Sequence, residues 1–416
     1  MKKRYVHLIT PLLSRYNRVV WIRFLGEFLT GLTGSMLTPF LIFYLQAKLG
    51  GSVVLPMFII GLQPFSEILV TLLGGNITDR IGRKPVILFA LGLQASAILG
   101  FILADSVWVF ALLYTLNGIG RSLFIPAQRA QITDVVGEHQ RSEVFAVLST
   151  VGYISATIGP LIGLLAYRYQ PVSLFFCEAF ALVIYALVFW RFVPESVSLH
   201  HTESQKQIAC TAQERKPLVA ALQDYRLILG LMIFSLPISF FYAQSETTLS
   251  LYLKNSFSNY LTIVASLTTI KAILAIVLGI FLVKVTQHLS TARIMMVAYS
   301  CFTITALIYG TASSFSLLVV AQLMVVIGES IGLNRLIQLV SILAPADQRG
   351  RYFSIYGTHW DISRSIGPVL GGYMLVGYGG ELLFLLVAVL LVVGGICQTL
   401  LTRRLTSQAL EAKGTS

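Results

Sequence analysis

The feature that most constrains this sequence is a series of twelve apolar stretches, each long enough to cross a lipid bilayer as a helix. A spanning helix needs about 20 apolar residues, because its backbone must bond to itself where no water is present. Charged residues make up only 12% of the chain, about half the share found in soluble proteins. The sequence therefore predicts an all-α integral membrane protein. The twelve predicted spans cover residues 19–46, 53–76, 86–104, 107–131, 143–168, 171–193, 227–253, 258–284, 293–312, 315–343, 351–376 and 381–402.

The net charge of +12 does not indicate nucleic-acid binding, because the basic residues are scattered at the ends of apolar stretches. If the N-terminus lies inside, 22 of the 30 Lys and Arg residues fall on the cytoplasmic side and 3 on the other. Cytoplasmic loops carry the excess of Lys and Arg. We therefore expect a multi-pass protein of the cytoplasmic membrane with both termini inside. The four cysteines are isolated, so no disulfide framework, metal site or cofactor is expected.

One long polar stretch divides the chain into halves of nearly equal size. Residues 194–226 are rich in Ser, Gln, Lys and Glu, and we interpret them as a cytoplasmic linker whose end, 218–222, is a candidate surface helix. The predicted domains are an N-terminal six-helix bundle, 1–193, and a C-terminal six-helix bundle with a short tail, 227–416.

The two halves also resemble each other in sequence. Residues 120–163 align with 328–371 at a constant shift and without a gap, which pairs Ser155 with Ser363 and Arg121 with Glu329. Internal repeats in membrane proteins are typical of transporters, whose substrate sites lie near the midplane between the repeats.

The loop between the second and third spans reads Gly-Asn-Ile-Thr-Asp-Arg-Ile-Gly-Arg-Lys-Pro over residues 75–85. It closely resembles the loop signature of the major facilitator superfamily, although a tight basic turn is the simpler reading of the loop alone. The resemblance implies two pseudo-symmetric six-helix bundles, and a cytoplasmic gate in which Asp79 latches the bundles and Arg83 pairs with an acid, here Asp134. The second half lacks the signature, so such a latch would be asymmetric. The implied gate residues are Gly75, Asp79, Arg80, Gly82, Arg83 and Asp134.

A stripe of small residues in the fifth span recurs in the eleventh span, and it has two interpretations. Such stripes let membrane helices approach closely, so simple helix packing is one of them. The stripe also resembles the antiporter signature of the superfamily's drug:proton branch, and Gly34 with the run Pro39–Leu45 resembles the first-span pattern of the same branch. This chain has Tyr114 where that branch often carries an arginine, with Arg121 seven residues later. The stripe comprises Gly152, Gly159, Pro160 and Gly163, and later Gly367, Pro368 and Gly371.

Ionisable residues inside membrane spans are costly and mark functional sites by default. Arg23 and Glu27 are four residues apart and Asp361 and Arg364 three, so each pair shares a helix face and has a structural ion pair as its alternative reading. Glu246 has no adjacent base in the sequence, which favours cationic cargo slightly. The candidates for proton coupling are Glu27, Glu329, Glu246, Asp361 and Arg121.

If the superfamily fold applies, the first, fourth, seventh and tenth spans line a central cavity. Aromatic side chains there suit flat or cationic compounds, with ordinary packing as the alternative. The cavity candidates are Phe40, Tyr44, Tyr114, Gln244 and Glu246.

Together these features predict a proton-coupled antiporter that exports amphipathic, drug-like and in part cationic compounds by alternating access. The alternative is an exporter of a specific lipid, sugar or metabolite on the same fold, and a remoter one is a receptor or assembly factor that transports nothing. The sequence has no ATP-binding P-loop and no hydrolase or metalloprotease motif, so an enzyme is not expected. The expected partners are a small-molecule substrate, protons and membrane lipid, with the chain acting as a monomer.

Overall fold

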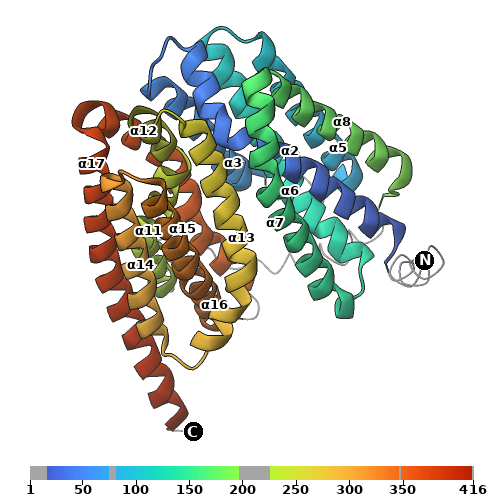
Figure 1. Ribbon diagram of the computed structural model, residues 1–416. Helices are drawn as coiled ribbons and strands as arrows, with labels where there is room; N and C mark the ends of the chain where they lie inside the picture. The colour runs from blue at the N-terminus through green and yellow to red at the C-terminus, as the bar shows by residue number, and fades with distance from the viewer. Residues whose placement is uncertain (1–15, 75–80, 196–224, 346–347, 415–416) are drawn as a thin grey trace, which may run out of the picture. The chain divides into compact units, whose positions relative to one another are not determined.

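The computed structural model describes residues 16–74, 81–195, 225–345 and 348–414, and every regular element in those ranges is a helix. The helices are shown in Figure 1. The bounds are α2 Arg18–Lys48, α3 Val54–Gly74, α5 Arg83–Leu103, α6 Val107–Val135, α7 Glu138–Tyr169, α8 Ser173–Phe192, α11 Arg226–Glu246, α12 Thr248–Ser256, α13 Tyr260–Thr286, α14 Thr291–Thr311, α15 Phe315–Gly328, the π-helix η2 Glu329–Leu333, α16 Asn334–Leu343 and α17 Arg349–Gly414.

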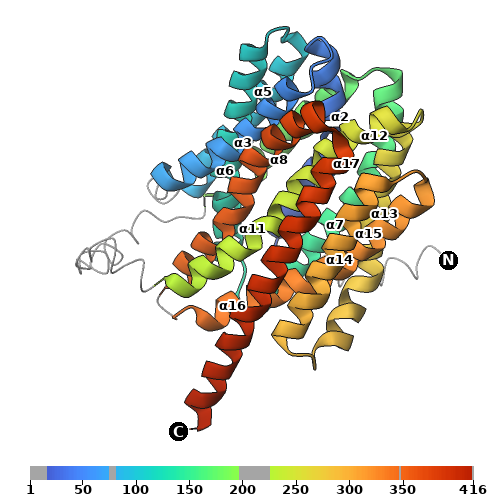
Figure 2. The same cartoon turned by 90° about the vertical axis from the view of Figure 1, so that its left-hand side faces the viewer.

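In the described residues, ten helical segments are long and apolar enough to cross a membrane, and α3 adds a shorter apolar helix. One of the ten, α17, contains two predicted spans, because Gly379 interrupts it with φ 82° and ψ 167°. Only glycine adopts such a positive φ without strain. Figure 2 shows the chain of α17 reversing direction at this turn. The segments thus correspond to the twelve predicted spans, and the all-α expectation is confirmed.

Two predicted spans are interrupted in the structure. The seventh was expected to continue to residue 253, but α11 ends at Glu246 and Thr247 has non-helical angles, so α12 begins as a separate short helix. Thr247 donates its hydroxyl to the Ala243 carbonyl at 2.6 Å. The predicted tenth span, 315–343, changes from α15 to η2 at Glu329. Hydrophobic length alone predicts neither break, because it indicates how far a segment reaches across a bilayer and not how its backbone turns.

The contacts group the chain into two compact units. Unit 1 comprises residues 1–38 and 69–212, and unit 2 comprises 39–68 and 213–416. The C-terminal part of α2 and most of α3 therefore group with unit 2, a grouping that differs from the predicted boundary at 193. The segment 196–224, with its predicted surface helix at 218–222, lies outside the described residues.

The small-residue stripe of α7 packs closely against α2 within unit 1. A Cβ on Gly159 would lie 2.9 Å from the Leu32 carbonyl oxygen, and one on Gly163 would lie 2.9 Å from the Cα of Met36. One turn earlier, Ser155 is fully buried and donates its hydroxyl to the Phe28 carbonyl at 3.4 Å. Helix packing therefore accounts for Gly159 and Gly163, since only glycine lets the two backbones come this close.

The repeated stripe in α17 makes the equivalent contact with α11 within unit 2, but with polar side chains. Gln244 donates from Nε2 to the Gly367 carbonyl at 2.8 Å. A Cβ on Gly371 would overlap the side chains of Gln244 and Thr248. Ser363, the counterpart of Ser155, is 2.8 Å from Ser239. The internal repeat seen in the sequence is thus also a repeat of helix contacts.

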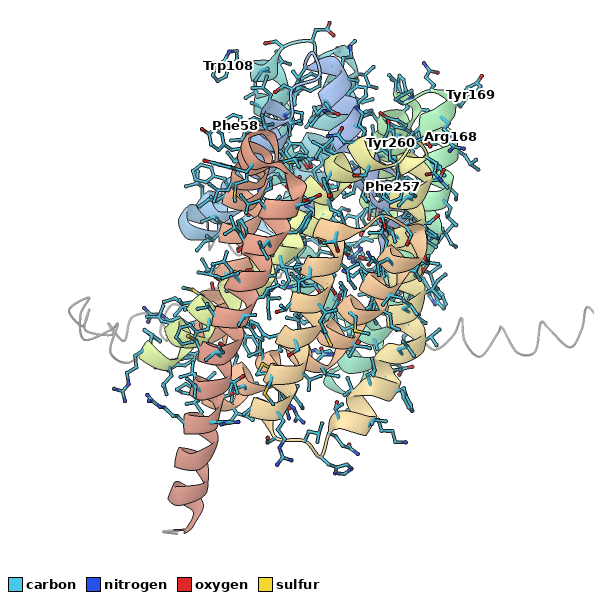
Figure 3. All side chains as sticks on the ribbon, turned by 60° about the vertical axis from the view of Figure 1, so that its left-hand side comes forward. Phe58, Trp108, Arg168, Tyr169, Phe257 and Tyr260 are labelled. Atoms are coloured by element: carbon cyan, nitrogen blue, oxygen red, sulfur yellow. The ribbon has the colours of Figure 1, made fainter. Side chains whose placement is uncertain are left out.

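Exposed aromatic side chains mark one end of unit 1. Figure 3 shows Trp108, at the start of α6, and Tyr169, at the end of α7, beside Arg168. Trp108 is 76% exposed and Tyr169 is 90% exposed. Trp and Tyr are enriched where membrane helices meet the water interface. In a bilayer, these residues are expected to lie at headgroup level.

Candidate functional site

In unit 2, the carboxylate of Glu329 contacts polar side chains from two other helices. Lys271 Nζ of α13 lies 3.3 Å from Glu329 Oε2. The hydroxyl of Tyr242, on α11, donates to the same oxygen at 2.8 Å. Lys271 Nζ also lies 4.7 Å from the centroid of the Tyr242 ring, in a cation–π contact. Three helices thus hold one carboxylate, and the lysine that pairs with it had no partner assigned from the sequence.

Glu329 is the first residue of the π-helix η2. A π-helix holds one residue more in its turn than an α-helix, and π-bulges occur frequently at functional sites. Two glycines let this segment press against α14: a Cβ on Gly328 would lie 3.1 Å from the Phe302 ring, and one on Gly332 would lie 2.6 Å from the Ala298 Cβ. The irregular turn and its close packing therefore fix where the Glu329 side chain points.

A second ion pair in unit 2 corrects an expectation from the sequence. Glu246 was expected to have no adjacent base, but Arg364 Nη2 lies 3.5 Å from Glu246 Oε2. Arg364 was expected to pair with Asp361; Asp361 and Glu67 also lie within electrostatic range of it. The contact with Glu246 crosses 118 residues, so neighbour spacing along one helix does not reveal it.

Two aromatic rings connect the two ion pairs. The Trp360 ring lies 5.2 Å from the Tyr242 ring in an edge-on arrangement, and Arg364 Cζ lies 5.9 Å from the Trp360 centroid. Next to Trp360, the fully buried His359 is 3.0 Å from Ser239 through Nδ1. Lys271, Tyr242, Trp360 and Arg364 thus form a continuous row of cations and rings between the two carboxylates.

The first-span pair lies in unit 1, as its spacing predicted. Arg23 Nη2 donates to Glu27 Oε2 at 2.6 Å, with 5% of the Arg23 side chain exposed and 33% of that of Glu27. A Cβ on Gly152 would be 3.9 Å from Glu27 Oε1. Arg121, on α6, lies within electrostatic range of Glu178 on α8. Glu27 and Arg121 therefore interact with groups of unit 1, and their predicted roles in proton coupling stay predictions.

The described part of the loop signature includes the expected ion pair: Arg83 Nε lies 3.5 Å from Asp134 Oδ2. Gly82 has φ 104°, which explains the glycine at this turn. Gly75, Asp79 and Arg80 lie outside the described residues. The structure adds Glu195, whose carboxylate accepts from the backbone amides of Arg83 at 3.0 Å and Lys84 at 3.1 Å. An acid 112 residues away thus caps the start of α5.

Removing this cap gives a testable stability change. Glu195→Ala is expected to lower the free energy of unfolding by about 0.5–2 kcal/mol, because two amides at a helix N-terminus lose an anionic acceptor. Glu195→Gln keeps an acceptor oxygen and is expected to lose less. The measurement is the thermal unfolding midpoint of the purified chain in detergent. If alanine and glutamine lower the midpoint equally, the acceptor is not what stabilises this helix start.

Three of the five cavity candidates are buried in the packing of unit 2. Phe40 and Gln244 are 0% exposed and Tyr44 is 5% exposed. Gln244 donates to the Gly367 carbonyl and accepts a hydrogen bond from the Thr248 hydroxyl at 2.7 Å. These three side chains serve helix packing in this conformation.

The other two cavity candidates differ from these. Tyr114 is half-buried, with its ring 5.8 Å from that of Phe101. Glu246 is exposed and belongs to the ion pair described above. The sequence did not single out Trp360, because a tryptophan in an apolar span resembles any packing residue.

The apolar helices of the described residues define the class of this chain as a polytopic α-helical membrane protein, and the family model and the relatives show that it is a transporter and not an enzyme. The chain belongs to the Major Facilitator Superfamily, whose family model matches residues 23–257 and 229–415. An uncharacterized MFS-type transporter of Bacillus subtilis (strain 168), YhjO, is 44% identical over 397 residues, covering 95% of this chain and 96% of that one.

Two further relatives are more distant and have more informative names. A Na(+), Li(+), K(+)/H(+) antiporter of Planococcus maritimus is 28% identical over 386 residues, 85% of this chain and 89% of its own. The multidrug resistance protein MdtG of Salmonella paratyphi C (strain RKS4594) is 28% identical over 386 residues, covering 90% and 92%. A solved POT family transporter in complex with a thioalcohol conjugated peptide shares the fold, with a TM-score of 0.77 at 13% identity over 94% of this chain and 97% of that one.

Proposed function

We propose that this transporter exports amphipathic, drug-like compounds across the cytoplasmic membrane in exchange for protons. The observation that carries the proposal is the Glu329 site: a partly exposed carboxylate in an apolar span, held by Lys271 and the Tyr242 hydroxyl. Ionisable side chains inside apolar spans are costly and mark proton and ion pathways. This carboxylate also contacts a basic side chain from another helix, so a change in its charge would change a contact between helices.

The chemistry of one cycle follows from these contacts. A proton on Glu329 removes the charge that attracts Lys271, so the lysine is free to leave the carboxyl and the Tyr242 ring. Loss of the proton restores the ion pair. In this scheme Glu246 and Arg364 form a second ion pair that protonation can open. Glu27 and Arg23 form the candidate ion pair of this kind in unit 1.

The names of the relatives are compatible with both halves of the proposal, since one is a multidrug resistance protein and another exchanges cations for protons. We further propose that both termini lie in the cytoplasm, that the Arg83–Asp134 pair belongs to a gate on that side, and that the polar linker divides two six-helix bundles. A monomer is the simplest assembly for this scheme.

The proposal is tested with the purified full chain in proteoliposomes that hold a pH-sensitive dye. With a pH gradient imposed, ethidium is expected to move against its own gradient, and adding ethidium is expected to speed the collapse of the pH gradient. A protonophore should abolish the ethidium gradient. Empty liposomes are the control, and ethidium movement that ignores the pH gradient would contradict proton coupling.

A second candidate is exchange of monovalent metal cations for protons, favoured by the similarity to the Planococcus antiporter. In the same vesicles it predicts that external Na⁺ or K⁺ collapses the pH gradient without any organic compound. Choline chloride at the same ionic strength is the control. A response to the metal cations and none to ethidium would replace the drug-export proposal with this one.

A further inference from the structure

In the row between the two carboxylates of unit 2, each aromatic ring is already in contact with a cation of the protein. Lys271 Nζ lies 4.7 Å from the centroid of the Tyr242 ring, and Arg364 Cζ lies 5.9 Å from that of Trp360. A cation beside an aromatic face and a carboxylate is how proteins bind organic ammonium ions. The Lys271 end of this row therefore has the chemistry of a cation-binding site whose present occupant is a side chain.

Lys271 is suited to leave that position. Its ammonium is a compact charge on a flexible stem of four carbons, and 30% of its side chain is exposed. Its ion pair with Glu329, which is 34% exposed, is not sealed from surrounding molecules. The other two components are held in place: Tyr242 is 4% exposed and Glu329 begins the π-helix packed on α14. The Lys271 ammonium can thus move, whereas the Tyr242 ring and the Glu329 carboxylate are held in place.

The charges of the network leave room for an added cation. Three carboxylates, those of Glu246, Glu329 and Asp361, belong to the two pairs or lie within electrostatic range of Arg364. Lys271 and Arg364 are the basic side chains that these contacts include. When all three acids are ionised, the negative charges exceed the positive ones by one, so a single cargo cation restores balance.

We propose that Lys271 is a tethered competitor for cargo: Glu329 and the Tyr242 ring form a site for the cationic group of an organic monocation, and that group displaces the Lys271 ammonium when it binds. Lys271 thereby keeps the affinity for cargo low enough for release, which makes it a specificity-determining residue. This inference rests on the proposed function, because it names the charge class of the exported compounds and the side chain that limits their binding.

The test measures binding of tetraphenylphosphonium to the purified full chain in detergent by equilibrium dialysis, without any gradient. Lys271→Met and Lys271→Gln are expected to bind it about tenfold more tightly than the unchanged chain, since the ring and the carboxylate lose their tethered occupant. Lys271→Arg keeps the charge and is expected to bind like the unchanged chain. The matched control is Lys284→Met, which removes the same charge from an exposed position at the end of α13.

Variants of the ring separate competition from a general loss of positive charge. Combined with Lys271→Met, Tyr242→Phe is expected to keep most of the gain in affinity, and Tyr242→Leu is expected to lose it. Equal or weaker binding by both neutral lysine variants, in chains that elute as single species, overturns the inference. If neither variant folds, Tyr242→Leu in the unchanged background decides, because undiminished binding there also overturns it.

These outcomes are independent of the transport experiment. A binding gain with no proton-driven ethidium movement would leave the tethered-lysine site standing and refute the proposed antiport. Proton-driven movement with no binding gain would do the reverse.

Discussion

Glu329→Gln is expected to abolish proton-driven accumulation of ethidium in proteoliposomes while leaving downhill movement of ethidium measurable. Glutamine keeps an oxygen that accepts the Tyr242 hydroxyl bond, now 2.8 Å long, but it cannot take up a proton. The accumulation ratio is therefore expected to fall to about the value in empty liposomes.

Two further variants distinguish a loss of proton coupling from a loss of folding. Glu329→Gln leaves Lys271 without its acid, so the double change with Lys271→Met removes both charges together and should fold at least as well. Glu381→Gln makes the same chemical change at an exposed position beside the turn at Gly379, and accumulation should be unaffected. Full accumulation by a folded Glu329→Gln chain would exclude this residue from proton coupling.

The second large effect is expected at the contact between α7 and α2. Gly163→Ala should lower the free energy of unfolding by about 1–3 kcal/mol, because the new Cβ meets backbone atoms of Met36 that cannot rotate away. The measurement is the thermal unfolding midpoint in detergent.

Gly152→Ala on the same helix is the matched control for this substitution. Its Cβ would find only Glu27 Oε1, at 3.9 Å. This change should be neutral or slightly stabilising, since alanine favours helix over glycine. If the two variants unfold at the same temperature, close backbone approach is not the reason for glycine at residue 163.

The fold was predictable from the sequence because the bilayer imposes a simple rule: a long apolar segment must form a helix. The same rule explains where prediction failed. The break after Glu246 and the π-helix at Glu329 leave the apolar segments long enough to span, so hydropathy does not reveal them. At the first break the Thr247 hydroxyl bonds a backbone carbonyl, and at the second the chain packs closely on α14. The turn at Gly379 lay in the short gap between two predicted spans, where a glycine was a visible signal.

The charged site was only partly predictable. Every acid in it was recognisable as an ionisable residue inside an apolar segment, and the pair of Arg23 and Glu27 followed from helix spacing. The partners of Glu329 and Glu246 did not, because Lys271 and Arg364 reach them from other helices. Spacing along one helix gives neighbours on a face, whereas contacts between helices depend on rotation and depth.

One consequence concerns the repeat itself. The constant shift that aligns the two halves places Pro126 of α6 opposite Asn334, the first residue after the π-helix. Proline withholds a backbone hydrogen bond, and a π turn inserts one extra residue that rotates the rest of the helix by about 100°. The fourth span of each half is therefore interrupted at the same aligned position, by a proline in α6 and by a π-helix in the tenth span. Beyond that level, alignment by numbering no longer implies the same facing direction, so the two halves of the repeat present different helix faces at aligned positions.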